Sequence, residues 1–352
     1  MLQVSKEQLA KVSYLDLSAL GDRTVKLMPL WDGSEWHMWV NSPVGLIEAK
    51  IVDTSEGDYV AQTAATPSDL YIPFVHIMWQ QASWKEVCPL VMAISDDFHN
   101  IGTSVAKLKH FHRFRREIVS GGARRFASTE LEYLVTLLRS VFDLLQEMFS
   151  IIWKDKVRLT DPHAEEIRRR RTLPRRFSSM VLVEKNNPRT ANDIEAEFGL
   201  PSPLASQFAN AAPFFAYLRR IRDKVVHGQS GFGFIFETDR GFCVDPKIEP
   251  FRSFAGWRPE HRFNENIVSI LPWLADIIAR TIGMCNDLVT TFASVVHLPP
   301  PIAPKHVIFV RGPHNPALAE LLSLSATTSP WWDDSTGDSG PKKDVNPDHS
   351  VP

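Results

Sequence analysis

The strongest apolar pattern lies in residues 128–153, whose sequence is STELEYLVTLLRSVFDLLQEMFSIIW. Apolar residues recur there at alternating spacings of three and four, which is the period of a helix. They form two seams: Leu131, Val135, Leu138, Phe142, Leu145 and Phe149, and then Leu134, Leu137, Val141, Leu144, Met148 and Ile151. A helix that is apolar around most of its circumference must be covered by several neighbours. The sequence therefore predicts a central helix of a helical bundle, capped near Ser128.

Partners for this helix are expected on its C-terminal side. Residues 202–228 begin with Ser-Pro, an N-cap followed by a first helical residue, and continue as a helix interrupted at Pro213. Residues 264–297 predict a final long helix. Between these two helices, alternating phenylalanines and an Asp-Arg-Gly turn predict a β-hairpin over residues 231–246.

The remaining segments set the domain organisation. Residues 1–66 contain short apolar runs separated by turn residues, which predicts a small N-terminal β meander. Residues 67–120 are expected to be a helical connection, residues 121–300 the bundle, and residues 301–352 an extended, disordered tail. The predicted fold class is mainly α, a helical bundle with a β-hairpin insertion and a small N-terminal β meander.

Composition limits the functional classes. Among 352 residues, 39 Lys and Arg balance 41 Asp and Glu, so a nucleic-acid partner would have to be bound by a local basic surface. The three cysteines are scattered and favour a reducing compartment. Residues 1–20 contain four charged residues, unlike a signal peptide, and the most apolar stretch, residues 267–282, contains a proline and two charged residues. We expect a cytoplasmic protein with no membrane partner.

One short stretch contains residue types that are common in catalytic sites. Residues 218–228 are LRRIRDKVVHG, in which Arg222 and Asp223 are followed by His227. On a helix Arg222 and His227 lie roughly 140° apart, so one helix cannot bring both to one site. Asp223 and His227 are four residues apart and share a face, where the carboxylate can orient the imidazole. Gly228 is suited to end the helix just after that imidazole.

This pattern resembles the signature of the HEPN superfamily (higher eukaryotes and prokaryotes nucleotide-binding domains), in which an Arg, often followed by an acidic or polar residue, precedes a His near the end of a bundle helix. The resemblance implies a HEPN-like bundle and a metal-independent endoribonuclease without a cofactor, in which a ribose 2′-OH attacks the adjacent phosphate. It also implies catalytic roles for Arg222, Asp223 and His227 in a composite pocket of a homodimer. Bacterial defence or a toxin-type role is a further implication.

Two other functions fit the same residues. The bundle is expected either to be a catalytically silent HEPN-like scaffold that binds a nucleotide or a partner protein, or a helical protein-interaction module whose β meander is the recognition surface. The silent scaffold would bind through the same helix. A purely structural interpretation is that the basic residues near the motif are the solvated face of an amphipathic helix. The acidic net charge of the chain favours these alternatives.

RNA, as the expected partner, requires cationic contacts outside the motif. Arg219, Arg220 and Lys224 flank the motif, and a second basic cluster is the run Arg168, Arg169, Arg170 and Arg171. This run lies in residues 154–200, where scattered prolines predict a long mobile connection. Asp96, Asp97 and His99 resemble one half of a bundle metal site, but the second half is missing, so no metal site is predicted.

Overall fold

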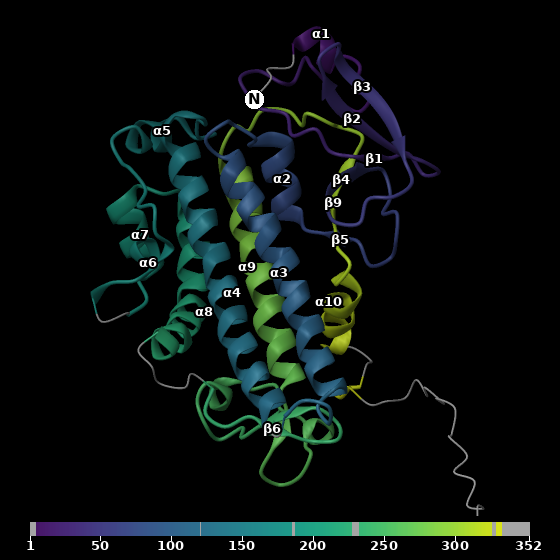
Figure 1. Ribbon diagram of the computed structural model, residues 1–352. Helices are drawn as coiled ribbons and strands as arrows, with labels where there is room; N and C mark the ends of the chain where they lie inside the picture. Colours follow the sequence, from purple (N-terminus) through teal and green to yellow (C-terminus); the bar gives the residue numbers. More distant parts are fainter. Residues whose placement is uncertain (1–4, 120, 185–186, 227–231, 326–328, 333–352) are drawn as a thin grey trace, which may run out of the picture.

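The computed structural model describes residues 5–119, 121–184, 187–226, 232–325 and 329–332, and it is mainly helical, as the sequence predicts (Figure 1). Four long helices form the bundle: α3 (Cys88–Arg113), α4 (Gly122–Asp155), α8 (Ser202–Val226) and α9 (Leu271–Val295). None of the described helices is both long enough and apolar enough to cross a membrane.

Helix α4 is the central member of the bundle and contacts α3, α8 and α9. Every residue of its first apolar seam is buried, and in the second seam only Leu144 and Ile151 are partly exposed. The helix starts at Gly122, before the predicted cap at Ser128, after Gly121 in the left-handed conformation. Ala123 and Ala127 bury the first turns of the helix. Their small side chains contribute little to an apolar sequence pattern, so the pattern did not predict these turns.

Ring contacts define the helix directions. Phe142 of α4 packs on Phe215 of α8, and one level further along α4, Phe149 packs on Phe208, so α4 and α8 are antiparallel. Helix α8 continues through Pro213, where an interruption is expected from the sequence. Pro213 is exposed, while Phe208, Phe214 and Phe215 are buried and hold the helix on both sides of it.

Helix α9 begins at Leu271, later than the predicted residue 264. Pro272 lies in its first turn, where the missing N–H of proline is not needed, so proline starts this helix and does not kink it. Immediately before it, β8 (Val268–Ser269) pairs antiparallel with β7 (Phe242–Val244), which pairs antiparallel with β6 (Phe236–Glu237). The predicted hairpin region therefore contributes two short strands to a three-stranded sheet. Its residue 231 lies outside the described residues.

The N-terminal strands form part of a larger sheet with the order β3-β2-β1-β4-β9-β5. These strands are β1 (Leu30–Trp31), β2 (Trp36–Ser42), β3 (Gly45–Ile51), β4 (Gly57–Ala61), β5 (Leu70–Tyr71) and β9 (Val307–Arg311). Strands β1 to β3 are antiparallel neighbours, but β1 and β4 are parallel, so the sheet is not a simple meander.

The expected disordered tail is wrong for residues 307–322. Strand β9 inserts between β4 and β5, with Ile308 and Val310 in the main core and Phe309 on the other face of the sheet. Helix α10 (Asn315–Leu322) follows and packs on α3. The N-terminal sheet is therefore completed by a strand from near the other end of the chain.

The predicted mobile connection of residues 154–200 is also wrong where the structure describes it. This segment contains α5 (Pro162–Arg168), α6 (Phe177–Val181) and α7 (Ala191–Phe198), and α6 and α7 pack on α8. Phe177, Met180, Val181 and Ile194 are fully buried. The remaining helices are α1 (Lys6–Leu9) and α2 (Pro73–Gln81), the latter between α3 and α9.

Candidate nucleic-acid interface

The motif lies at the C-terminal end of α8. Arg222 and Asp223 belong to its last turns, and the helix ends at Val226. Since α8 and α4 are antiparallel, this end lies beside the first half of α4, on the side of the molecule where α3 also ends and the β6-β7-β8 sheet packs (Figure 1). His227 and Gly228 lie outside the described residues.

Asp223 pairs with two arginines of its own helix. Its Oδ1 lies 3.2 Å from Nη1 of Arg222, and its Oδ2 lies 3.4 Å from Nε of Arg219. The three side chains are each about one-third exposed, with values of 34% for Asp223 and Arg222 and 31% for Arg219. The motif carboxylate therefore neutralises part of the positive charge of this face.

One nitrogen of Arg222 lacks a partner among the residues that the structure describes. Its Nε is buried and donates no hydrogen bond to any of them. A buried donor without an acceptor is costly, by about 1–3 kcal/mol. An oxygen supplied by a ligand would remove that cost, and phosphate and carboxylate oxygens are the acceptors that a guanidinium binds strongly.

The opposite side of α8 carries Arg220 and Lys224. Successive residues turn by about 100°, so both lie on the other side of the helix from Arg222. Both side chains are exposed, and neither forms an ion pair with any residue that the structure describes. They are four residues apart and therefore neighbours along one helix face.

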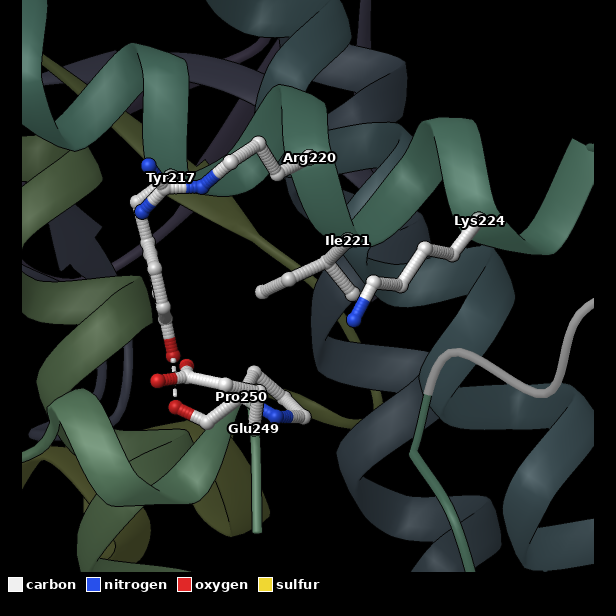
Figure 2. Close-up of a pocket in the computed structure, with 6 residues that line it drawn as sticks. All are labelled: Tyr217, Arg220, Ile221, Lys224, Glu249 and Pro250. Carbon is white, nitrogen blue, oxygen red and sulfur yellow. Dashed lines mark hydrogen bonds between the residues drawn. The ribbon is translucent and has the colours of Figure 1, made fainter.

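These two cations border a pocket of about 290 Å³. Figure 2 shows Ile221 and Lys224 extending from α8 toward Glu249 and Pro250, while Tyr217 reaches from α8 to Pro250. A second hollow of about 390 Å³ shares Tyr217 and Arg220 with the first. It adds side chains from α9 and from the segment after Pro250, namely Ser253, Phe254, Trp273, Asp276 and Arg280.

Tyr217 fixes the wall between the two hollows. Its hydroxyl donates to the carbonyl oxygen of Pro250 at 3.0 Å (Figure 2). The same hydroxyl accepts from Nε1 of Trp273 at 2.7 Å. Burial raises the pKa of Tyr217 to about 12, so the phenol is neutral at physiological pH. This residue therefore joins α8, α9 and the segment at Pro250 without adding charge.

The acids of the two hollows are already paired. Glu249 accepts from Nε of Arg252 at 3.1 Å and from the hydroxyl of Ser253 at 2.9 Å. Asp276 lies 3.6 Å from Arg280, four residues further along α9. The lining therefore holds three cations and two acids, and Arg220 and Lys224 are its cations without a carboxylate partner among the described residues.

The arginine run is not brought to this site. Arg168 is buried, donates to the carbonyl oxygen of Trp153 near the end of α4, and pairs with Glu165 at 2.7 Å, so the expectation that it binds RNA is wrong. Arg169 and Arg170 pair with Glu165 and Glu166, and Arg171 is exposed. These residues lie at the opposite end of the bundle from Arg222, because α4 and α8 are antiparallel.

The acid and histidine pattern of α3 does not form a metal site. In the described ranges no group of three or more His, Cys, Asp or Glu side chains is arranged to hold a metal ion. Asp97 instead faces Ser140 of α4, and burial raises the pKa of its carboxyl to about 6.

Sequence reasoning did not find the pocket beside α8. Tyr217 and Arg220 meet Glu249, Pro250 and Trp273 only through the packing of α8, α9 and the segment between them. The available signal was the spacing of Arg220 and Lys224 on one helix face. Comparison with protein-family models, curated proteins and solved structures finds no match for this chain.

Proposed function

We propose that the chain is a HEPN-like, metal-independent endoribonuclease whose catalytic residues are Arg222 and His227. The observation that carries the proposal is the buried Nε of Arg222, which has no acceptor among the described residues, in a side chain that is one-third exposed at the end of a bundle helix. An RNA phosphate provides such an acceptor. The role of His227 comes from the resemblance to the family.

The proposed reaction is an intramolecular transesterification of RNA. An imidazole removes the proton of the ribose 2′-OH, the 2′-oxygen bonds to phosphorus, and the bond from phosphorus to the 5′-oxygen breaks. The leaving 5′-oxygen takes up a proton from imidazolium, so the products are a 2′,3′-cyclic phosphate and a 5′-hydroxyl. Arg222 stabilises the negative charge that develops on the phosphate oxygens.

A second copy of the chain completes the proposed site. On an ideal helix, positions 222 and 227 are roughly 140° apart, which favours a site that takes the guanidinium from one chain and the imidazole from another. A two-fold axis beside the end of α8 brings Arg222 of one chain toward His227 of the other. Asp223, paired with Arg222 at 3.2 Å, acts as a positioning residue.

Incubation of labelled single-stranded RNA with the full chain in EDTA tests the proposal. We expect cleavage with cyclic phosphate ends by the parent, and a loss of at least 100-fold in His227→Ala and Arg222→Ala with unchanged thermal unfolding. His110→Ala and Arg170→Ala, changes at exposed positions outside the site, are matched controls. Undiminished cleavage by His227→Ala would contradict the assignment, and RNA binding without cleavage by the parent would favour the silent scaffold.

The biological role is a further part of the proposal. A ribonuclease of this type in bacterial defence or a toxin system should stop growth of the cell that makes it. Induced expression of the parent chain in a bacterium should lower colony counts by at least 100-fold, whereas His227→Ala should not. Equal colony counts for the two chains would contradict this role.

A further inference from the structure

The two hollows beside α8 adjoin at Tyr217 and Arg220, which line both, and we call the pair of hollows between this helix and residues 249–256 the groove. We propose that this groove binds single-stranded RNA beside the cleaved bond, with Arg220 and Lys224 holding successive phosphates and Phe254 stacking on a base. The inference rests on the proposed ribonuclease function and adds the form of substrate that the enzyme accepts.

Charge supports an anionic ligand in the groove. Three cations line it, and of these Arg280 is paired with Asp276, while Glu249 is paired with Arg252 outside the lining. Arg220 and Lys224 are the lining cations that have no carboxylate partner in the described part of the chain. A chain of phosphates is the ligand that matches two neighbouring unpaired cations.

Spacing supports a strand that runs along α8. Arg220 and Lys224 are four residues apart, which places their Cβ atoms about 6 Å apart on one face. Long side chains on such a pair can bind adjacent phosphates of one extended strand. The groove then continues past Tyr217 toward Phe254 and Trp273.

Shape supports a single strand over a duplex. The groove is concave, and its lining includes aromatic rings from Tyr217, Phe254 and Trp273. Phe254 is partly exposed, lines the second hollow and packs edge-on against Trp257, with 4.7 Å between the ring centres. Unstacked bases of a single strand can enter such a hollow and stack there, whereas the paired bases of A-form RNA are held inside the duplex.

The groove also has a defined relation to the motif. Positions 220 and 224 lie on one face of α8, and position 222 lies on the opposite side. A strand bound by Arg220 and Lys224 therefore runs along the face away from Arg222 of the same chain, and in the proposed dimer it meets Arg222 of the second copy. The groove and the composite dimer site are thus compatible.

Binding of a fluorescent 2′-O-methyl RNA tests the inference without cleavage, because this RNA has no free 2′-OH. We expect the full-length parent to bind the single strand at least 10-fold more tightly than a duplex of the same sequence. The double variant Arg220→Gln, Lys224→Gln should bind at least 10-fold more weakly, and its slope of log affinity against log salt should be smaller by about 1.4, since each single-strand contact contributes about 0.7. Phe254→Ala should weaken binding about 10-fold without changing the slope.

The matched control is Lys85→Gln, Lys305→Gln, which removes two exposed cations away from the groove and should leave affinity unchanged. Equal binding of duplex, unchanged affinity and slope in the groove variant, or equal displacement by polyglutamate would overturn the inference. Cleavage of natural RNA tests the nuclease proposal separately from this binding experiment. If the nuclease proposal fails, natural RNA is not cleaved by the parent, whatever the 2′-O-methyl RNA shows.

Discussion

Asp223 lies 3.2 Å from Arg222 and 3.4 Å from Arg219, so the acid of the motif holds two arginines of the same helix. From the sequence, the expected partner of this carboxylate is the imidazole four residues later, which lies outside the described residues. The observed pairs give Asp223 a different role. It limits the positive charge of this face and fixes the direction of the Arg222 guanidinium.

Asp223→Asn should separate binding from catalysis. Loss of the carboxylate leaves Arg219 and Arg222 unneutralised, so we expect the KM for RNA to fall or stay constant. The kcat should fall about 10-fold because Arg222 is no longer oriented, and Asp223→Glu should recover part of it. Asp287→Asn, the same charge change at an exposed position of α9, is the control. A rise in KM with unchanged kcat would contradict a positioning role.

Subunit mixing tests the composite site. Arg222→Ala and His227→Ala chains, each inactive alone, should form a heterodimer that retains one Arg and one His at the shared pocket. Cleavage should reappear after the two are unfolded together and refolded, at a fraction of the parent rate. Size-exclusion chromatography with light scattering should show a dimer. A monomer that cleaves RNA at the parent rate contradicts this arrangement.

Arg168 is expected to act in stability and not in RNA binding. Arg168 is buried, and its Nε and Nη2 donate to the two carboxylate oxygens of Glu165 at 2.7 and 2.9 Å. These hydrogen bonds lower the pKa of Glu165 to about 2. Breaking one partner of a buried pair leaves an uncompensated charge. Arg168→Gln should lower the free energy of unfolding by about 3 kcal/mol in chemical denaturation.

The exposed control for this prediction is Arg170→Gln, which breaks a surface pair with Glu166 and should cost about 0.5 kcal/mol or less. Substitution of Arg169, Arg170 and Arg171 by Gln should leave RNA affinity and its salt dependence at parent values, since these residues lie near the start of α8, at the opposite end of that helix from Arg222. A smaller salt slope in the triple variant would instead support a second RNA surface at that end of the bundle.

The parts of the fold that sequence predicts are those set by local periodicity. The two seams of α4 demand burial on most of its surface, and the structure confirms that burial. Strand β9 was missed because five residues between prolines resemble an extended tail, and only contact with β4 and β5 makes them a strand. Likewise, Arg168 looks like one of four equivalent arginines until Glu165 and the end of α4 enclose it.

The candidate site also has a part that the sequence predicts and a part that depends on packing. Arg222 and Asp223 are recognisable from their order in the chain, and Arg220 and Lys224 from their helical spacing. Arg220 and Lys224 have no acid partner in the described part of the chain because the two acids of the lining, Glu249 and Asp276, are paired with Arg252 and Arg280. Such pairing is a property of packing between α8, α9 and residues 249–256, which no local pattern encodes.

The pH dependence of stability should reveal the buried carboxyl of Asp97. Its ordinary pKa is 3.8, and burial against α4 raises it to about 6 despite the hydrogen bond from Ser140. Between these values the folded chain binds more protons at this site than the unfolded chain does. The free energy of unfolding therefore falls as the pH rises from about 4 to above 6, and the penalty is complete above that range.

Asp97→Asn removes this titration and keeps a polar group of the same size. At pH 8 the variant should be more stable than the parent by about 1 kcal/mol. A shift of about two pKa units corresponds to roughly 3 kcal/mol at 1.36 kcal/mol per unit, and the expected effect is smaller because the side chain is partly solvated. The difference should shrink as the pH falls and vanish below about pH 3, where the parent carboxyl is protonated in both states. Thermal unfolding of both chains at several pH values measures this, with Asp287→Asn as the exposed control. A variant that is destabilised at pH 8, or a difference that does not change with pH, would show that the Asp97 carboxylate is stabilised by its surroundings and not penalised.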